Sequence, residues 1–238
     1  MTLTVCLEGS DGMVLASDSR GTFGDPRGLT AQNDTIRKLY PLAKHVGVLL
    51  SGANEMGAMI MDEAGRLIKQ GEVNGTTNVM AAMREVLRRR YGEWFPNFQM
   101  QPMPNVPVPV RPALIVTVGG YDVEEGGSCT LQRTYSLSSL LDFAPSLHNF
   151  GFALSGVPQY ATYLLNRLYG RSMNIDHLKR LAVYVISETA TQDAKVGGPI
   201  QVATVTPADG IRVLDADEID NLSRANAKIN MKLRRLFT

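Results

Sequence analysis

The sequence predicts an α+β fold in which antiparallel β-sheets carry helices on their outer faces. Three observations lead to this prediction. Strand-like runs outnumber helical ones, short polar turns typical of hairpins separate several of them, and the order is strands, two helices, strands, two helices, strands, helix. The length of 238 residues suits one large domain, so we expect a single domain over residues 1–238.

A β-hairpin is predicted at the start of the chain. Short apolar runs over residues 4–7 and 13–16 flank the polar turn at residues 9–12, and a glycine-rich loop is predicted over residues 21–28. Further strands are predicted from short runs of β-branched and other apolar residues. These runs cover residues 36–40, 46–50, 113–118, 129–135, 150–154, 201–206 and 211–214.

Helices are predicted where apolar residues recur at helical spacing. In the first helix these residues are Met56, Met59, Ile60, Ala64, Leu67 and Ile68, and in the second they are Val79, Ala82, Met83, Val86, Leu87 and Tyr91. Methionines in such stripes usually fill a core rather than bind a cofactor. Two more helices are predicted over residues 158–169 and 175–191, the first with Pro158 in its opening turn.

A C-terminal helix is predicted from its charges and apolar spacing. It begins with the acidic residues Asp215, Asp217 and Glu218 and ends with the basic residues Lys232, Arg234 and Arg235, which suits the helix dipole. Its apolar face consists of Ile219, Leu222, Ile229, Leu233 and Leu236.

A proline-rich segment separates the second helix from the next strand. Residues 96–112 read PNFQMQPMPNVPVPVRP, a proline density that neither a helix nor a central strand tolerates. We expect a loop insertion or an extended arm. A functional or contact surface and a surface excursion without a role are both open.

The composition argues against several classes of protein. The formal net charge is +1, so no basic excess favours nucleic acid. The first residues show no signal peptide, and no apolar run approaches the roughly 18 residues that cross a bilayer, so we expect a cytoplasmic protein without a membrane partner. Cys6 and Cys129 form no CxxC pair, and three scattered histidines show no metal-ligand spacing, so neither a cofactor nor a metal is expected.

Thr2 is a candidate nucleophile because it directly follows the initiator methionine. Removal of Met1, which we expect from the small size of residue 2, would leave a threonine with a free α-amine. A hydroxyl needs a base to take its proton, and an α-amine with an ordinary pKa of about 7.7–8.0 is a usable base. Many proteins begin in this way without such a role, so Thr2 alone is weak evidence.

Three further features have possible chemical roles. Asp18 lies in the run Ala-Ser-Asp-Ser-Arg after the second strand, and Lys38 interrupts an apolar strand. A half-buried lysine paired with an aspartate would stay charged, whereas the alternative is a surface ion pair of little value. Residues 49–53 run from a strand into a helix, where a backbone N–H of Gly52 could bind an oxyanion, unless Ser51 merely caps the helix.

Together these features resemble the proteasome β subunits, which are N-terminal-nucleophile (Ntn) hydrolases. That family has a carboxylate sixteen residues after its nucleophilic threonine and a small–glycine pair fourteen residues after a lysine. Here the same spacings separate Thr2 from Asp18 and Lys38 from Gly52. The resemblance implies a four-layer αββα sandwich of two antiparallel sheets.

The resemblance continues into the second half of the chain. Residues 154–156 resemble a Gly-Ser-Gly that precedes a helix in the family, and Asp193 precedes the Gly-Gly pair 197–198 and a strand. The strand at 114–118, followed by Gly119 and Gly120, also fits. Nearly the whole chain is covered.

The resemblance implies a role for each matched residue. Thr2 would attack the scissile carbonyl, Lys38 would favour deprotonation there, Asp18 would orient Lys38, and the Gly52 N–H would hold the oxyanion. Ser155 and Asp193 would hydrogen-bond around the α-amine. The position of a second serine in the family is Val196 here, and Leu3 replaces a small or hydroxyl residue.

A substrate pocket for the P1 side chain is implied as well. It would be lined by Gly21, Ile36, Leu50 and Asn54, which favours an apolar P1 residue. The leading hypothesis is a threonine peptidase whose identical subunits form a ring or spiral around an inner chamber, acting on peptides or unfolded proteins, with an ATP-dependent unfoldase or another cap as a further partner.

Two alternatives remain open. Val196 and a retained Met1 would suit a catalytically silent assembly subunit, which intact mass spectrometry would reveal. An Ntn amidase or peptide ligase with a defined substrate would be separated from a general peptidase by an epoxyketone label followed by a substrate panel.

Overall fold

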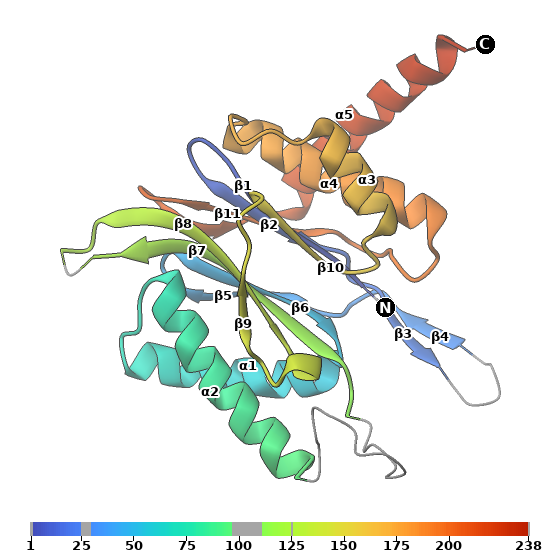
Figure 1. Ribbon diagram of the computed structural model, residues 1–238. Helices are drawn as coiled ribbons and strands as arrows, with labels where there is room; N and C mark the ends of the chain where they lie inside the picture. Colours follow the sequence, from blue (N-terminus) through green and yellow to red (C-terminus); the bar gives the residue numbers. More distant parts are fainter. Residues whose placement is uncertain (1, 25–29, 97–110, 125, 238) are drawn as a thin grey trace.

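The computed structural model describes residues 2–24, 30–96, 111–124 and 126–237 (Figure 1). Its strands form two five-stranded sheets and a two-stranded ribbon, and all paired strands in these residues are antiparallel. The first sheet has the order β10-β1-β2-β11-β12, with β1 Leu3–Glu8, β2 Met13–Ser17, β10 Phe152–Gly156, β11 Gln201–Thr206 and β12 Gly210–Val213. The second sheet has the order β5-β6-β7-β8-β9, with β5 Leu39–Ala43, β6 Val46–Gly52, β7 Leu114–Val123, β8 Cys129–Ser138 and β9 Pro145–Leu147. The ribbon pairs β3 Gly21–Gly24 with β4 Thr30–Asn33.

The helices form the two outer layers. They are α1 Asn54–Gln70, α2 Thr76–Trp94, α3 Gln159–Leu168, α4 Ile175–Gln192 and α5 Ala216–Arg235, with a 3₁₀ turn at Ser139–Leu141. Figure 1 shows α1 and α2 outside the second sheet and α3 and α4 outside the first. The expected α+β sandwich with four layers, αββα, is therefore confirmed.

Three apolar clusters lie between the four layers. One joins α1 and α2 to the second sheet, and another joins α3 and α4 to the first sheet. The third lies between the two sheets and includes Cys6, Met13, Leu15, Leu39, Leu49, Ala153, Ala203 and Val205. Since alternate side chains of a strand point to opposite faces, each central strand contributes to two of these clusters.

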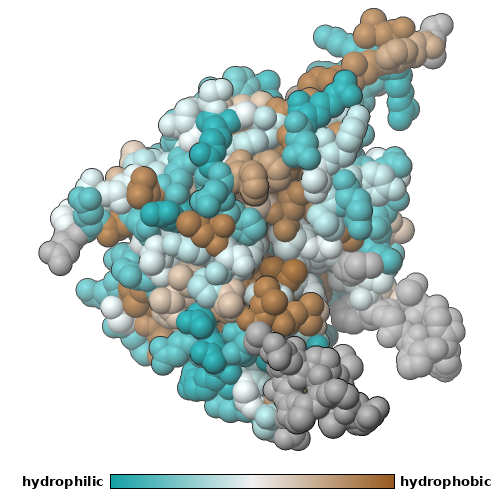
Figure 2. All heavy atoms as spheres, viewed as in Figure 1, coloured by the Kyte–Doolittle hydropathy of each residue, from teal (hydrophilic) through white to brown (hydrophobic). Residues whose placement is uncertain are grey.

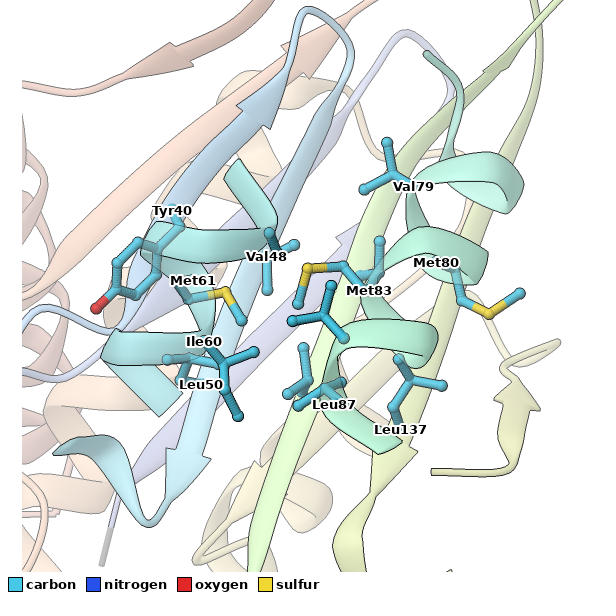
Figure 3. Packing of buried hydrophobic residues seen from close by; sticks show 14 of the residues in the cluster. Tyr40, Val48, Leu50, Ile60, Met61, Val79, Met80, Met83, Leu87 and Leu137 are labelled. Carbon is cyan, nitrogen blue, oxygen red and sulfur yellow. The ribbon is translucent and has the colours of Figure 1, made fainter. Parts of the chain in front are cut away.

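The methionine stripes mostly fill the core, as expected. Figure 3 shows Met61 of α1 and Met83 of α2 turned toward one another above the second sheet, and both are buried. The face predicted for the first helix was partly wrong, because Met59 is 64% exposed and Leu67 is 46% exposed. Met61 takes the inward position instead, since the inward stripe of α1 lies along Gly57, Ile60, Met61, Ala64 and Ile68.

Some element boundaries differ from the predictions. The predicted strand 36–40 begins only at Leu39, because the Ile36 carbonyl and the Lys38 N–H bond to the Gln201 side chain, and the Ile36 N–H bonds to the Ser19 carbonyl rather than to a neighbouring strand. The predicted strand 150–154 is shifted to β10, and Phe150 lies outside it, 82% exposed. The loop predicted at 21–28 contains strand β3 at its start.

Helix α5 packs on the body from its start to Asn230, whose Nδ2 donates to Glu188 Oε1 of α4 at 2.5 Å. Asp215 caps it by accepting a hydrogen bond from the Glu218 N–H at 2.8 Å, and Ile219 and Leu222 join the cluster under α4. The remainder projects away from α4 (Figure 1), and Leu236 is 76% exposed.

Some expectations concern residues that the structure does not describe. Most of the proline-rich segment, residues 97–110, lies outside the described residues, as does Met1. Within the described ranges, none of the helices combines the length and apolar character needed to span a bilayer.

The cluster between the sheets predicts a large effect of Leu49→Ala. Leu49 is fully buried there, so truncation should lower the free energy of unfolding by about 2–5 kcal/mol. Leu131→Ala, at a position 54% exposed on β8, is the control and should change it by less than about 0.5 kcal/mol. Urea denaturation measures both, and equal losses would contradict the assigned layers.

Candidate active site

Thr2 lies at the entrance to β1 and is held there through its backbone. The residue is 1% exposed, and its carbonyl accepts a hydrogen bond from the Val157 N–H at 2.8 Å. The next N–H, of Leu3, donates to Oδ1 of Asp18 at 3.0 Å, while the Leu3 side chain is buried beneath α4. The replacement of a small residue by Leu3 is thus accommodated by the core, and the Thr2–Leu3 peptide is fixed against Asp18.

Asp18 and Lys38 form a fully buried ion pair. Lys38 Nζ donates to Asp18 Oδ1 at 2.7 Å and to the Arg20 carbonyl at 2.7 Å, and both side chains are 0% exposed. The other oxygen, Asp18 Oδ2, accepts hydrogen bonds from the Arg20 N–H at 3.2 Å and the Gly197 N–H at 3.0 Å. A buried carboxylate is costly unless its oxygens are satisfied, and here backbone donors and Lys38 satisfy both.

The environment of Lys38 weakens its hold on its proton. Burial lowers the pKa of Lys38 below the ordinary lysine value, while the negative charge of Asp18 and its hydrogen bond oppose this shift. Asp34 opposes it too, whereas Arg20 adds to it. Lys38 therefore carries a positive charge beside the Thr2–Leu3 peptide, and it loses its proton at a lower pH than a surface lysine does.

Ser155 lies among hydroxyl groups between the sheets. It is paired with Thr4 across β10 and β1, and the two hydroxyl oxygens are 2.5 Å apart. Ser51 of the opposite sheet donates to Ser155 Oγ at 2.9 Å. The predicted bond from Ser155 to the α-amine involves atoms next to Met1, which lies outside the described residues, and stays a prediction.

The segment after α4 reaches the site through a residue that sequence reasoning missed. Asp193 ends α4, and its carboxylate accepts the Lys195 N–H at 2.8 Å. The Gly197 N–H bonds directly to Asp18, whereas the predicted hydrogen bond of Asp193 around the α-amine stays a prediction. A side chain at Gly197 would meet the Arg20 guanidinium at 2.6 Å, so the Gly-Gly pair was the available signal.

Val196 is fully buried in the apolar cluster beneath α4. Its side chain therefore contributes to that core, and the position offers no hydrogen-bonding group to the α-amine.

Gly52 adopts a backbone conformation that favours glycine. Its φ is +97°, and a Cβ at this position would lie 2.1 Å from the Ala113 carbonyl oxygen. The residue is exposed at the end of β6 and lines a pocket. Its assigned role, donation of the N–H to an oxyanion, stays a prediction.

The pocket beside Gly52 has a volume of about 280 Å³. It is lined by Gly21, Thr22, Ile36, Gly52, Ala53, Asn54, Glu55, Met56 and Pro112. Gly21, Ile36 and Asn54 lie where the sequence predicted them, whereas Leu50 does not line it. Side chains alternate along β6, so Leu50 points into the core beneath α1, as Figure 3 shows, where it packs close to Gly57.

The described side chains contain no group of three or more histidines, cysteines or acids that could hold a metal ion.

The αββα sandwich is that of the Ntn fold, and its first strand begins after a threonine, next to a buried Lys–Asp pair. The family model described as "Proteasome subunit" matches residues 2–103.

Known proteins are similar to this chain over most of its length. The proteasome subunit beta of Methanococcus aeolicus is 26% identical over 226 residues, which cover 93% of this chain and 91% of that protein. The subunit of Methanococcus maripaludis strain C7 is 25% identical over 243 residues, covering 97% and 93%. The solved structure of the Anbu (Gly-1) mutant from Hyphomicrobium sp. strain MC1 has a TM-score of 0.71 at 16% identity, covering 100% of this chain and 96% of that one, and supports the fold. The resemblance to proteasome β-type Ntn hydrolases is confirmed.

The lowered pKa of Lys38 predicts a pH-dependent contribution to stability. Between this pKa and the ordinary value of 10.5, the unfolded chain binds more protons at Lys38 than the folded chain does. The free energy of unfolding of the wild type minus that of Lys38→Met should therefore rise as the pH rises through this window.

Denaturation series at several pH values measure that difference. Lys69→Met, on the exposed side of α1, controls for the loss of one lysine side chain. A difference that falls with pH would contradict the direction of the shift.

Proposed function

We propose that the chain is a threonine peptidase that forms an acyl-enzyme on Thr2 once Met1 has been removed. The observation that carries the proposal is the shared oxygen Asp18 Oδ1, which binds both the Leu3 N–H and the buried Lys38 Nζ. This arrangement brings the positive charge of Lys38 close to the Thr2–Leu3 peptide. The match to the proteasome family model supports the same kind of chemistry.

The proposed reaction has two steps. The Thr2 hydroxyl oxygen attacks the scissile carbonyl, and its proton passes to the Thr2 α-amine, directly or through water, and then to the leaving amine as the peptide bond breaks. Lys38 favours deprotonation of Thr2 by its charge, Asp18 orients Lys38, and the Gly52 N–H faces the oxyanion. Water then hydrolyses the ester, which restores Thr2 and releases the acid product.

The pocket suits a P1 side chain of moderate size. Apolar surface comes from Ile36, Met56 and Pro112, and Glu55 is the one charged residue among the described lining residues. A peptide or an unfolded protein is the proposed substrate, in a cytoplasmic assembly of identical subunits. A cap such as an ATP-dependent unfoldase would deliver folded proteins to the chamber.

Val196 favours a second candidate, a catalytically silent assembly subunit. This position is apolar and buried, and the Ser155 hydroxyl already has two hydroxyl neighbours. Intact mass spectrometry of the chain purified from its own cells separates the candidates, because a mature chain that retains Met1 would support the silent subunit.

Thr2→Ala should abolish peptide hydrolysis while the fold and assembly survive. The loss should be on the order of 10³-fold or more, because no other group replaces the nucleophile. A threonine-directed epoxyketone should add its mass to the wild type and not to Thr2→Ala. Thr2→Ser, which keeps a hydroxyl, is the matched control and should retain activity. Undiminished hydrolysis by Thr2→Ala would overturn the proposal.

The exposed end of α5 predicts a contact between subunits. Figure 2 shows apolar atoms along the projecting helix, which belong to Ile229, Met231, Leu233, Leu236 and Phe237. Exposed apolar patches of this kind mark interaction surfaces, and a partly unsupported helix gains stability from packing. We expect the double change Leu233→Glu and Leu236→Glu to reduce the size of the assembly.

Light scattering after size exclusion measures that change. Leu140→Glu, at an exposed position in the 3₁₀ turn, is the control for an added charge elsewhere and should leave the size unchanged. An unaltered assembly in the α5 double variant would show that this end makes no subunit contact.

A further inference from the structure

Gln201 lies at the beginning of β11, next to the buried ion pair, and has no role in the proposed reaction. Its cross-strand neighbour is Ser17, the residue before Asp18. Its alternate residues Ala203 and Val205 face the space between the sheets. The side chain of Gln201 therefore lies in the layer between the sheets, at the end next to Lys38.

The side-chain amide of Gln201 makes four hydrogen bonds, two at its oxygen and two at its nitrogen. Its Oε1 accepts from the N–H groups of Lys38 at 3.1 Å and Leu39 at 3.2 Å. Its Nε2 donates to the Ile36 carbonyl at 2.7 Å and to Ser19 Oγ at 2.9 Å. Three of these partners are backbone groups, which fix which end of the amide is oxygen and which is nitrogen.

Gln201 supplies three of the hydrogen bonds to the backbone of residues 36–39. Residues 36–38 are not part of a strand, and Lys38 is followed directly by β5. Other bonds to this backbone run from the Ile36 N–H to the Ser19 carbonyl, from the Leu50 N–H to the Lys38 carbonyl and from the Tyr40 hydroxyl to the Arg37 carbonyl. Gln201 thus takes the place of a neighbouring strand and satisfies two N–H groups whose burial without partners would be costly.

The same segment serves two parts of the site. Ile36 lines the substrate pocket, and Lys38 supplies the ammonium group that binds Asp18. We propose that Gln201 is a positioning residue that fixes this segment, so that one amide sets both the pocket wall at Ile36 and the place of Lys38 beside Thr2. This inference rests on the proposed peptidase function.

Gln201→Met tests the inference in the full-length protein, because it keeps the length of the side chain and removes all four hydrogen bonds. We expect kcat to fall on the order of 10²-fold, the size of effect that a displacement of about 1 Å produces at a reacting centre. KM for a peptide should rise as well, since the Ile36 wall loosens. The alkaline limb of kcat should move to higher pH as Lys38 gains contact with water.

Val205→Ala is the matched control, because it lies on the same strand and face and creates a cavity away from Lys38. It should lower stability while leaving kcat and the alkaline limb unchanged. The inference is overturned if Gln201→Met retains the wild-type kcat and pH profile. It is also overturned if Val205→Ala, when it is as stable as Gln201→Met, loses as much activity.

Amide hydrogen exchange separates this outcome from failure of the proposed function. Faster exchange at Lys38 and Leu39 in Gln201→Met, and not in Val205→Ala, supports the positioning role whether or not the protein cleaves peptides. Equal exchange in both variants overturns it. A wild type that neither hydrolyses peptides nor takes up the epoxyketone overturns the peptidase proposal alone.

Discussion

The buried carboxylate of Asp18 is the interaction on which the site depends. It accepts hydrogen bonds from Leu3 on β1, Arg20 after β2, Lys38 before β5 and Gly197 after α4. Four segments far apart in the chain are thereby held at one point. An unpaired charge in this position would cost several kcal/mol, so the fold must bring all four donors together for the pair to exist.

The layers of the sandwich stabilise the meeting of these four segments. The cluster between the sheets is apolar over most of its extent, and polar groups border it where Thr4, Ser51 and Ser155 meet and where Gln201 binds the segment before β5. A dry core on one side strengthens the electrostatic interactions of Lys38, while hydroxyl and amide groups satisfy the backbone around it. The groups proposed to act in the reaction therefore lie where the apolar layer between the sheets meets polar side chains.

Much of the architecture could be predicted because its signals are local. The hairpin at residues 4–16, the helices α2 and α4, and the capped start of α5 follow from apolar spacing and from residues such as Asp215. The errors occurred where local patterns are ambiguous. Met59 and Met61 are equally apolar, and only the sheet beneath α1 decides which is buried.

The sequence by itself determined the α+β class and the spacing of Thr2, Asp18, Lys38 and Gly52, because each depends on residue identity along the chain. That spacing carries the resemblance to proteasome β subunits, and the resemblance in turn implied the four layers. Only the tertiary structure decided which groups touch. It placed the Gly197 N–H on Asp18, and it turned Leu50 away from the pocket. Such contacts join residues nearly 180 positions apart, and their geometry follows from strand register and packing, which no local pattern encodes.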